Sequence, residues 1–552
     1  MKTIAKHNAL IAVFVLLSLA AYVKTTVGEV GHTTLDDAYM VTRYAKHWLA
    51  GEGFSWNSID GPAYGITSPV YLIVITAFLG LTGCSAAMAL SITSFAAGLL
   101  SAMALALLGF LVQGRELSRK SWLPLLAVPS LLLVQPFRYH SLTGMETTFS
   151  LLSNSLLACS IVIAARRRST AALVLCLFSG FLSYATRPDN GLYALLLPPL
   201  FFVATNRALW RYSVRYAVCF GLLVGFSLLV NQVLFADFVP LPFFAKGSGF
   251  YQGYVGATKW NAMTEMILFY TAAMPCLVVL ASTASKRILP QLFAIAVVVI
   301  ATFGYYATVT QIMGGQSRYY YPSIAFLFLA AFTAISSYAI TTPTQPLCIA
   351  ITWRLLVGLV ILLPALSSPL KHLATDLWEK YVIGSPAAIH HVTQYRKAQD
   401  RPLPPLGWSN SVMAVSDLLE RMPPEIVLTA SEYGWLGSRF SHLTIIDLVG
   451  LHDRTIAHHG FSAAYVLSRK PDLIWFPHGD YTYAVAQILD DAGFRRDYEY
   501  YPNAYDYGIA LRKKSKIYAA MKAETEKEFF RIYSGLNMSD YLAEPVALPD
   551  KD

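Results

Sequence analysis

The chain has 552 residues, of which 55% are hydrophobic and only 14% are charged. Soluble globular proteins carry roughly 25% charged residues, so this composition excludes a chain that faces water on every side. The formal net charge is +9. The basic residues cluster in short loops between apolar blocks, a distribution that orients a membrane protein and gives no reason to expect a nucleic-acid partner.

The amino-terminal segment has Lys2 and Lys6 before an apolar run that ends near Val23. A cleaved signal peptide has the same features. Because many further apolar blocks follow, we expect an uncleaved anchor instead. The six cysteines lie in or beside apolar blocks without CxxC spacing, which indicates buried free thiols and favours neither a disulfide framework nor a zinc site.

Apolar blocks of roughly 15 to 27 residues, long enough to cross a hydrocarbon core as helices, run through the first two thirds of the chain. They lie near residues 8–23, 67–82, 86–112, 121–136, 147–165, 171–186, 190–205, 213–235, 263–283, 288–309, 320–339 and 347–367. If every block spans, the basic loops after residues 112 and 165 are exported, against the positive-inside rule. If instead the block 67–82, interrupted by Pro69 and Gly80, lies along the exported interface, all basic loops become cytoplasmic. We therefore expect about eleven spans with the amino terminus inside.

The last third of the chain changes character, because no block in it is long enough to span. Alternating apolar stretches typical of strands occur at 425–430, 443–449, 471–476 and 507–511, with a helix-like stretch at 483–491. Pro402, Pro404 and Pro405 mark a linker before them. The predicted fold is a polytopic α-helical membrane domain over residues 1–368, whose first exported loop at 24–85 carries interfacial helices, followed by a soluble α/β domain at 369–552 on the exported side.

Asp36 and Asp37 stand together in the first exported loop, just before a stretch at 38–49 that has the pattern of an amphipathic helix. Two adjacent carboxylates at the mouth of a membrane domain are costly to place there. One of them could accept a proton from an acceptor hydroxyl as a general base. They could also cap the helix that follows, by accepting hydrogen bonds from its free N–H groups.

Single ionisable residues stand at the exported ends of other predicted spans: Glu146, Arg187, Asp189, Lys246 and Arg318. Snorkelling of a charged side chain to the interface would explain each one separately. Together the cations could hold a phosphate and stabilise the negative charge on it as it leaves. Aromatic residues crowd the same exported segments, where they could form an interfacial belt or stack on sugar rings, and the sequence leaves both roles open.

The motifs of the first exported loop resemble a known family. Asp36-Asp37-Ala38-Tyr39 is followed by Arg43-Tyr44-Ala45, Gly53-Phe54-Ser55-Trp56-Asn57 and Gly65-Ile66-Thr67-Ser68-Pro69. This order resembles the GT-C polyprenyl-phosphate arabinofuranosyltransferases, which include AftB-type cell-wall enzymes and TfpW-type pilin arabinosyltransferases. The resemblance continues with Gly144-Met145-Glu146-Thr147, Thr186-Arg187-Pro188-Asp189, Pro240 with Ala245-Lys246, Arg318 before Pro322, and Asp447 to Asp453.

The resemblance implies a GT-C fold and a membrane glycosyltransferase. Such an enzyme would move a pentose, D-arabinofuranose, from a polyprenyl-phosphate donor to a hydroxyl of an envelope glycan or of a surface protein such as pilin. It would work on the periplasmic face of a bacterial inner membrane. A lipid monophosphate donor has no pyrophosphate to neutralise, so neither a metal nor another cofactor is expected.

The resemblance also implies roles for particular residues of this sequence. Asp36 or Asp37 is the expected catalytic residue, with Asp36 preferred as the base and Asp37 as the group that orients sugar or acceptor. The expected contacts to the donor and its phosphate are Arg187, Lys246, Arg318 and Tyr319. The other expected substrate contacts are Tyr39, Trp56, Thr67, Glu146, Asp189 and Asp447. The sequence departs from the family at Leu241-Pro242, where Asn-Thr is expected, and at Ser68, where Asn is usual.

Other classes of protein also place charged residues in a multi-span bundle. A transporter or flippase of lipid-linked sugars would have charges near span midpoints and repeated halves. In this sequence the charges fall at predicted span ends and no internal repeat is visible. A non-catalytic assembly or receptor protein would be the better reading only if Asp36 and Asp37 were dispensable.

Overall fold

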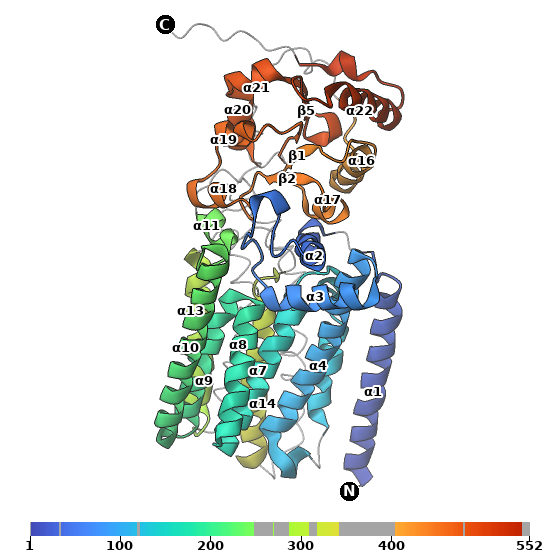
Figure 1. Cartoon of the computed structure of the whole chain (residues 1–552). Coiled ribbons are helices and arrows are strands. Elements are labelled where there is room, and N and C mark those ends of the chain that lie inside the picture. Colours follow the sequence, from blue (N-terminus) through green and yellow to red (C-terminus); the bar gives the residue numbers. More distant parts are fainter. Residues whose placement is uncertain are drawn as a thin grey trace, which may run out of the picture. The chain divides into compact units, whose positions relative to one another are not determined.

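The computed structural model describes residues 2–32, 35–118, 122–247, 269, 286–308, 317–341, 403–477 and 481–543. These residues divide between two compact units, drawn from different stretches of the chain (Figure 1). The first unit falls within Met1–Thr33, Thr67–Val230 and Lys259–Ser385, and the second within Thr34–Ile66, Asn231–Thr258 and Pro386–Asp552.

This division corrects the expected domain boundaries at one point. The first exported loop was expected to belong to the membrane domain, yet most of it clusters with the carboxyl-terminal domain. The expected boundary near residue 368 and the predicted spans 263–283 and 347–367 lie outside the described residues, apart from Phe269.

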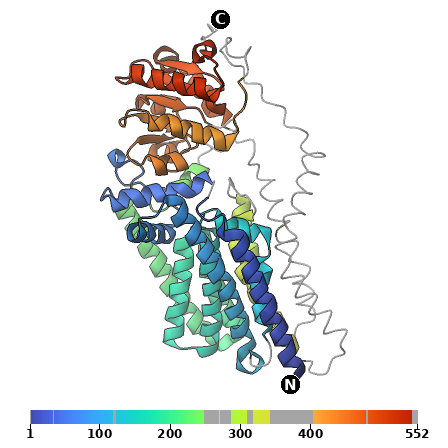
Figure 2. The same ribbon diagram turned by 90° about the vertical axis from the view of Figure 1, so that its right-hand side faces the viewer.

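The first unit is a bundle of apolar helices. They are α1 (Lys2–Val27), α3 (Pro69–Thr82), α4 (Ala86–Ser118), α5 (Ala127–Leu132), α6 (Gln135–Leu142), α7 (Thr147–Arg167), α8 (Thr170–Thr186), α9 (Gly191–Thr205), α10 (Trp210–Phe235), α13 (Leu289–Thr308) and α14 (Ile324–Thr341). Within the described ranges, five helices (α1, α4, α7, α10 and α13) are long and apolar enough to cross a membrane, and α3, α8 and α14 are shorter apolar helices. Figures 1 and 2 show the long helices side by side.

Helices α4 and α7 pack closely at the centre of this bundle. Their interface combines buried apolar residues such as Leu105 and Leu151 with hydroxyl groups that bond across it. The Thr148 hydroxyl donates to the Ser94 carbonyl at 2.8 Å, and the Ser101 hydroxyl donates to the Thr148 carbonyl at 3.2 Å. Small polar residues allow such close approach of helices where water is excluded.

Helix α3 runs across one end of the bundle rather than alongside the long helices (Figure 1), where it contacts α4 and α8. This orientation agrees with the prediction that the block 67–82 does not span. Pro69 occupies the first turn, where its missing N–H costs no hydrogen bond. The predicted interruption at Gly80 is wrong, because α3 continues through it and ends at Gly83 with a φ of 63°.

The basic loops of the first unit lie at the other end of the bundle from α3. Arg166, in the last turn of α7, donates to the carbonyl of Val112 at 2.6 Å. Tyr212 donates to the carbonyl of Ser169 at 3.0 Å, which brings the start of α10 to the same end. Gln291, just after the basic pair at 286–287, donates to Thr205 at 2.9 Å. The described basic loops therefore share one end, as the predicted topology requires.

The predicted span 121–136 is not one helix. It forms a 3-10 turn (Leu123–Leu126), the short α5 and then α6, with an extended residue at Val134 between the last two. Pro136 in the first turn of α6 explains the break, because a proline cannot donate to the preceding turn and its ring would clash with it.

The second unit contains a five-stranded sheet in the order β2-β1-β3-β5-β4. Its strands are β1 (Val427–Ala430), β2 (Thr444–Asp447), β3 (Leu473–Trp475), β4 (Tyr498–Tyr501) and β5 (Ile509–Arg512). β1 pairs in parallel with β2 and β3, while β5 is antiparallel to both β3 and β4. The sheet confirms the predicted α/β fold, and each predicted strand stretch overlaps one strand. β4 was not predicted.

The second unit also contains helices from three parts of the chain. They are α2 (Asp36–Leu49), α11 (Leu241–Gly247), α16 (Trp408–Glu420), α17 (Gly434–Arg439), α18 (Arg454–His459), α19 (Ala463–Ser468), α20 (Thr482–Asp490), α21 (Ala492–Asp497) and α22 (Tyr518–Ile532). α2 confirms the predicted amphipathic helix, and α20 nearly coincides with the predicted helix at 483–491. α11 packs on α18, where Asp237 accepts from His458 at 2.8 Å and pairs with Arg454 at 3.2 Å.

Candidate functional site

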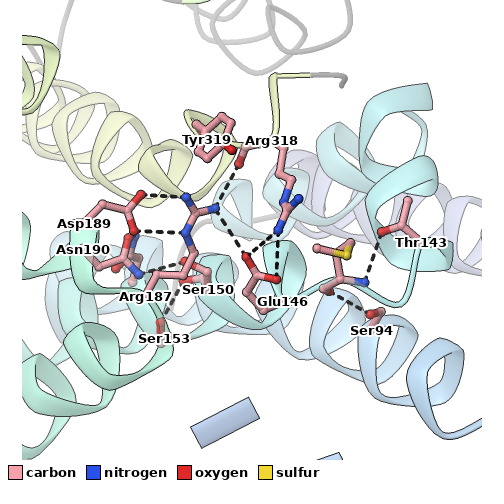
Figure 3. A network of polar contacts seen from close by, with 12 residues as sticks. Ser94, Thr143, Glu146, Ser150, Ser153, Arg187, Asp189, Asn190, Arg318 and Tyr319 are labelled. Carbon is pink, nitrogen blue, oxygen red and sulfur yellow. Dashed lines mark hydrogen bonds and ion pairs between the residues drawn. The ribbon is translucent and has the colours of Figure 1, made fainter. Parts of the chain in front are cut away.

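A buried cluster of charged residues lies in the first unit, where three chain segments meet. Glu146 precedes α7, Arg187 and Asp189 follow α8, and Arg318 precedes α14. Figure 3 shows these four side chains turned toward one another, with the Tyr319 ring beside them. The structure thus brings together five of the residues that the sequence singled out.

Arg187 is held by Asp189 in a two-pronged contact. Its Nε donates to Oδ1 at 3.1 Å and its Nη2 donates to Oδ2 at 2.7 Å. Arg187 is 5% exposed, and paired N–H groups of this kind fix the plane of the guanidinium. The chain turns here because Pro188 disfavours helix at the residue before it, and Arg187 accordingly has extended backbone angles.

Arg318 pairs with Glu146 from the opposite side. Its Nη2 lies 3.1 Å from Oε1 and 3.3 Å from Oε2. The Nη1 of Arg187 lies 3.9 Å from the same Oε1, so both guanidinium groups face one carboxylate. The two guanidinium carbons also lie 5.4 Å and 5.9 Å from the Tyr319 ring centre, within cation–π range.

The pKa of Glu146 reflects this arrangement. Burial alone would raise it, but the positive charges of Arg318 and Arg187 outweigh burial and lower it to about 2. For Arg187, burial would lower the pKa, but Asp189 and other neighbours raise it above its ordinary value. Glu146 is therefore ionised at neutral pH, and its negative charge faces two guanidinium groups.

Uncharged side chains that the sequence analysis did not single out support the cluster. Asn190 donates to the Ser150 hydroxyl at 2.8 Å, and Asn154 donates to Asn190 at 3.1 Å and to the Pro322 carbonyl at 3.1 Å. The hydroxyl of Tyr306, on α13, donates to Asp189. Polar residues inside apolar blocks were the available signal, because they are costly in a membrane unless they have partners.

The acidic pair lies in the second unit, where it begins α2. Asp36 is 4% exposed. Its carboxylate accepts hydrogen bonds from the backbone N–H groups of Gly434 and Trp435, both at 2.7 Å. The predicted helix-cap role is thus observed in a different form: Asp36 caps α17, which lies 398 positions later in the chain, and no side chain caps α2 itself.

Burial raises the pKa of Asp36, and the nearby charge of Glu432 raises it further. The two backbone N–H groups act in the opposite direction, and the pKa is about 7. Asp37, the next residue of α2, is half-buried. The two carboxylates therefore occupy different environments.

The side chains of Trp56 and Tyr39 are buried against other side chains. Trp56 is 2% exposed, stacks on His452 at 4.1 Å between ring centres, and has the Arg43 guanidinium 4.6 Å from its ring centre. The Tyr39 ring is 2% exposed and meets Trp435 edge-on at 4.7 Å. Both rings therefore pack within the second unit, and the substrate contacts predicted for them stay predictions.

Asp447 also serves the fold of the second unit. It is 1% exposed, and its carboxylate accepts from the N–H groups of Val449, Gly450 and His452 at 2.6 to 3.1 Å. It therefore shapes the turn that follows β2, and its predicted substrate contact stays a prediction. Burial raises its pKa to about 6 against the effect of these hydrogen bonds.

The two remaining predicted residues belong to different units. Thr67 lies just before α3 in the first unit and is half-buried. Lys246 is near the end of α11 in the second unit. Among the described residues, no group of three or more His, Cys, Asp or Glu side chains is arranged to hold a metal ion.

Comparisons with known proteins agree with this fold. Residues 393–522 match the model of a domain of unknown function, DUF8728. No curated protein matches the sequence. The structure is similar to crystal structures of ArnT from Cupriavidus metallidurans in the apo state (13% identity, TM-score 0.50, covering 92% of this chain and 98% of ArnT) and bound to undecaprenyl phosphate (14%, 0.51, 91% and 98%). At this level of identity the likeness shows the fold alone, which is similar to that of ArnT.

Proposed function

We propose that this protein is a membrane glycosyltransferase whose donor is a sugar linked to a polyprenyl phosphate. The observation that carries the proposal is the pair of arginines, Arg187 and Arg318, that face one carboxylate within a fold similar to that of ArnT, which has been crystallised with undecaprenyl phosphate. A buried guanidinium is suited to bind a phosphate oxygen and to stabilise the charge that develops as the phosphate leaves.

The two arginines are suited to different parts of this task. Arg187 already directs two of its nitrogens to Asp189, so its position is fixed by the protein. Arg318 contacts Glu146 through one nitrogen, Nη2. A phosphate oxygen would compete with the Glu146 carboxylate for Arg318, and we assign the main phosphate contact to Arg318. Tyr319 and Lys246 are further proposed donor contacts, Tyr319 because its ring lies beside both guanidinium groups.

The reaction needs a base for the acceptor hydroxyl. The hydroxyl oxygen forms a bond to the anomeric carbon, the bond from that carbon to the phosphate oxygen breaks, and the proton passes to a carboxylate. Polyprenyl phosphate leaves with the bonding electrons. We assign the base to the Asp36–Asp37 pair. A monophosphate leaving group can be stabilised by arginines alone, so the proposal includes no metal or other cofactor.

The sugar and acceptor follow from the motifs of the sequence. We propose D-arabinofuranose as the sugar, and a hydroxyl of an envelope glycan or of a surface protein such as pilin as the acceptor. The support is the ordered set of motifs shared with the AftB-type and TfpW-type enzymes, from Asp36 to Asp453. The reaction would occur on the periplasmic face of the inner membrane, opposite the basic loops.

The direct test is transfer by the purified chain in lipid nanodiscs. Synthetic polyprenyl-phosphate sugars and candidate acceptors are supplied, and the glycosylated acceptor is measured by mass spectrometry. We expect transfer by the parent chain. Arg318→Ala should weaken donor binding by about tenfold to a hundredfold, because a charge-assisted hydrogen bond contributes roughly 1.5–3 kcal/mol.

A matched control separates donor binding from folding. Arg318→Ala alone leaves Glu146 with less positive charge nearby, whereas the double variant Glu146→Gln/Arg318→Ala removes both charges. The double variant should regain thermal stability but not donor affinity. Parental donor affinity in a folded Arg318→Ala protein would contradict the phosphate assignment. Movement of the lipid-linked sugar across the bilayer without transfer would instead support the flippase alternative.

A further inference from the structure

Helices α2 and α17 of the second unit lie together and run in the same direction. Asp36, the first residue of α2, accepts from the first N–H groups of α17. Near the end of α2, Lys46 donates to the Ser438 carbonyl at 2.5 Å and His47 lies 2.8 Å from the Ser441 carbonyl. Both helices therefore begin at one end of their contact and finish at the other.

Arg43 fills the carboxyl-terminal end of this contact. It is fully buried, and its Nη1 donates to the carbonyls of Gly437 and Phe440 at 3.0 and 3.2 Å. Its Nη2 donates to the Leu443 carbonyl at 2.7 Å, and its Nε donates to the Trp56 carbonyl at 2.6 Å. The last carbonyls of a helix lack partners within the helix, so one guanidinium here satisfies several acceptors.

The charges on α2 match the ends of α17. A helix has partial positive charge at its amino terminus and partial negative charge at its carboxyl terminus. α2 places a carboxyl group, Asp36, at the first end and two cations, Arg43 and Lys46, at the second. Parallel helix dipoles repel each other, and this arrangement of side chains offsets that repulsion.

Two glycines of α17 permit the close contact. A Cβ atom at Gly434 would come within 2.0 Å of the Asp36 backbone oxygen. A Cβ at Gly437 would lie 2.8 Å from the Trp56 ring and 3.1 Å from the Arg43 side chain. Glycines three residues apart lie on the same face of a helix. At these two positions, the face of α17 that contacts α2 carries no side chain.

We propose that Asp36 is a positioning residue, which with Arg43 clamps α2 onto α17, and that Asp37 is the carboxylate that acts on the acceptor hydroxyl. This inference rests on the proposed function and changes the role expected for Asp36. Successive residues of a helix project about 100° apart. The side chain that points at the amino terminus of α17 is therefore Asp36, while Asp37 projects from a different side of α2.

The test replaces the clamp with a covalent bond. The hydroxyl oxygens of Thr42, on α2, and Ser438, on α17, are 2.6 Å apart. A disulfide is expected to form in the double variant Thr42→Cys/Ser438→Cys. Asp36→Asn and Asp37→Asn are made with and without this lock. The side-chain amide of the Asp36→Asn variant would present an NH₂ group to one of the α17 N–H donors, which weakens docking, whereas the Asp37→Asn change leaves the Asp36 carboxylate and its two backbone contacts in place.

Transfer and hydrogen exchange are measured for each protein, oxidised and reduced. We expect Asp36→Asn to lose about a hundredfold in transfer through misplacement of α2 and to exchange faster over residues 36–49. The oxidised lock should restore both, and reduction should reverse the rescue. Asp37→Asn should lose about 10² to 10⁴ in rate with or without the lock, with parental exchange.

Other results would overturn the proposal. If the lock restores slow exchange in Asp36→Asn but not transfer, Asp36 acts on substrate directly. If locked Asp37→Asn transfers at the rate of the locked parent, Asp37 is not the base. Failure of the parent to transfer any sugar would remove the proposed function and the role of Asp37 with it, while the exchange data alone would still decide whether Asp36 clamps α2.

Discussion

Glu146 lies between two guanidinium groups, and its protonation state therefore affects the whole charged cluster. Protonating it would remove the negative charge that faces both Arg187 and Arg318. An uncompensated buried charge is strongly destabilising. The pKa of Glu146 is lowered from its ordinary value of 4.5 to about 2 in the folded protein. Its contribution to stability is thus fully present above pH 4.5 and is lost as the pH falls toward 2.

Glu146→Gln should change the pH dependence of unfolding. Lowering of the pKa from 4.5 to about 2 corresponds to a contribution of about 3 kcal/mol at neutral pH. We expect the parent to lose this stability between pH 4.5 and about 2, and the variant to lack that part of the loss. Thermal unfolding in detergent from pH 7 to pH 3 measures it. The exposed Glu420→Gln variant is the control, and should follow the parent. Identical pH profiles for the parent and Glu146→Gln would contradict the charge-pairing account.

Single residues also show where prediction from sequence works. Glu146, Arg187, Asp189 and Arg318 could be grouped in advance, because loop charge predicts which span ends lie on the same side. The packing of Trp56 and Asp447 could not be predicted. Their partners, His452 for Trp56 and the backbone of the next turn for Asp447, depend on how a distant segment packs or on how a local loop closes. The spacing of residues in the sequence predicts neither the packing of a distant segment nor the closure of a local loop.

Secondary-structure elements followed their patterns where the period was clear. The amphipathic pattern predicted α2, and alternation predicted β1, β2, β3 and β5. β4 has the sequence Tyr-Glu-Tyr-Tyr, whose aromatic residues favour strands, but four residues are too few for a clear period. The break between α5 and α6 was missed because hydrophobicity alone does not distinguish one long helix from two short ones.

The contact between α2 and α17 gives a prediction about glycine. Gly434→Ala would place a methyl group against backbone of α2, at 2.0 Å from the Asp36 oxygen, where no side chain can move away. We expect it to destabilise the second unit by about 3 kcal/mol or more, since overpacking of a rigid site is costly. Gly225→Ala, with open space around its Cβ, is the matched control and should be neutral. Thermal unfolding and limited proteolysis within residues 36–49 measure both. Resistance of Gly434→Ala to both would show that α2 is not packed as described.

At the scale of the whole molecule, each compact unit is made of stretches that are not consecutive in the chain. The second unit takes α2 from the first exported loop, α11 from a later loop and its sheet from the carboxyl-terminal third. The motifs that resemble the arabinofuranosyltransferases include the residues that join these segments, such as Arg43, Trp56 and His452. Some of the motif residues therefore hold the segments of this unit together. A prediction that follows chain order places such segments in the membrane domain, because they lie between its predicted spans.

The topology of the first unit can be tested with cysteines at its two ends. The basic loops gather at the end away from α3, and the positive-inside rule makes that end cytoplasmic. Arg167 lies there and is exposed, while Ser85 is exposed between α3 and α4. In a background without the six native cysteines, Ser85→Cys should react with an impermeant thiol reagent added to intact cells. Arg167→Cys should react only after the membrane is permeabilised.

The contrast between the two positions is what makes this test informative. If α3 crossed the membrane, one more span would separate position 85 from the amino terminus, and every later loop would change sides. Position 167 would then be labelled in intact cells and position 85 would be protected. That outcome would place the Arg187–Arg318 cluster on the cytoplasmic side, where an exported acceptor cannot reach it. The proposed reaction would then need an acceptor inside the cell.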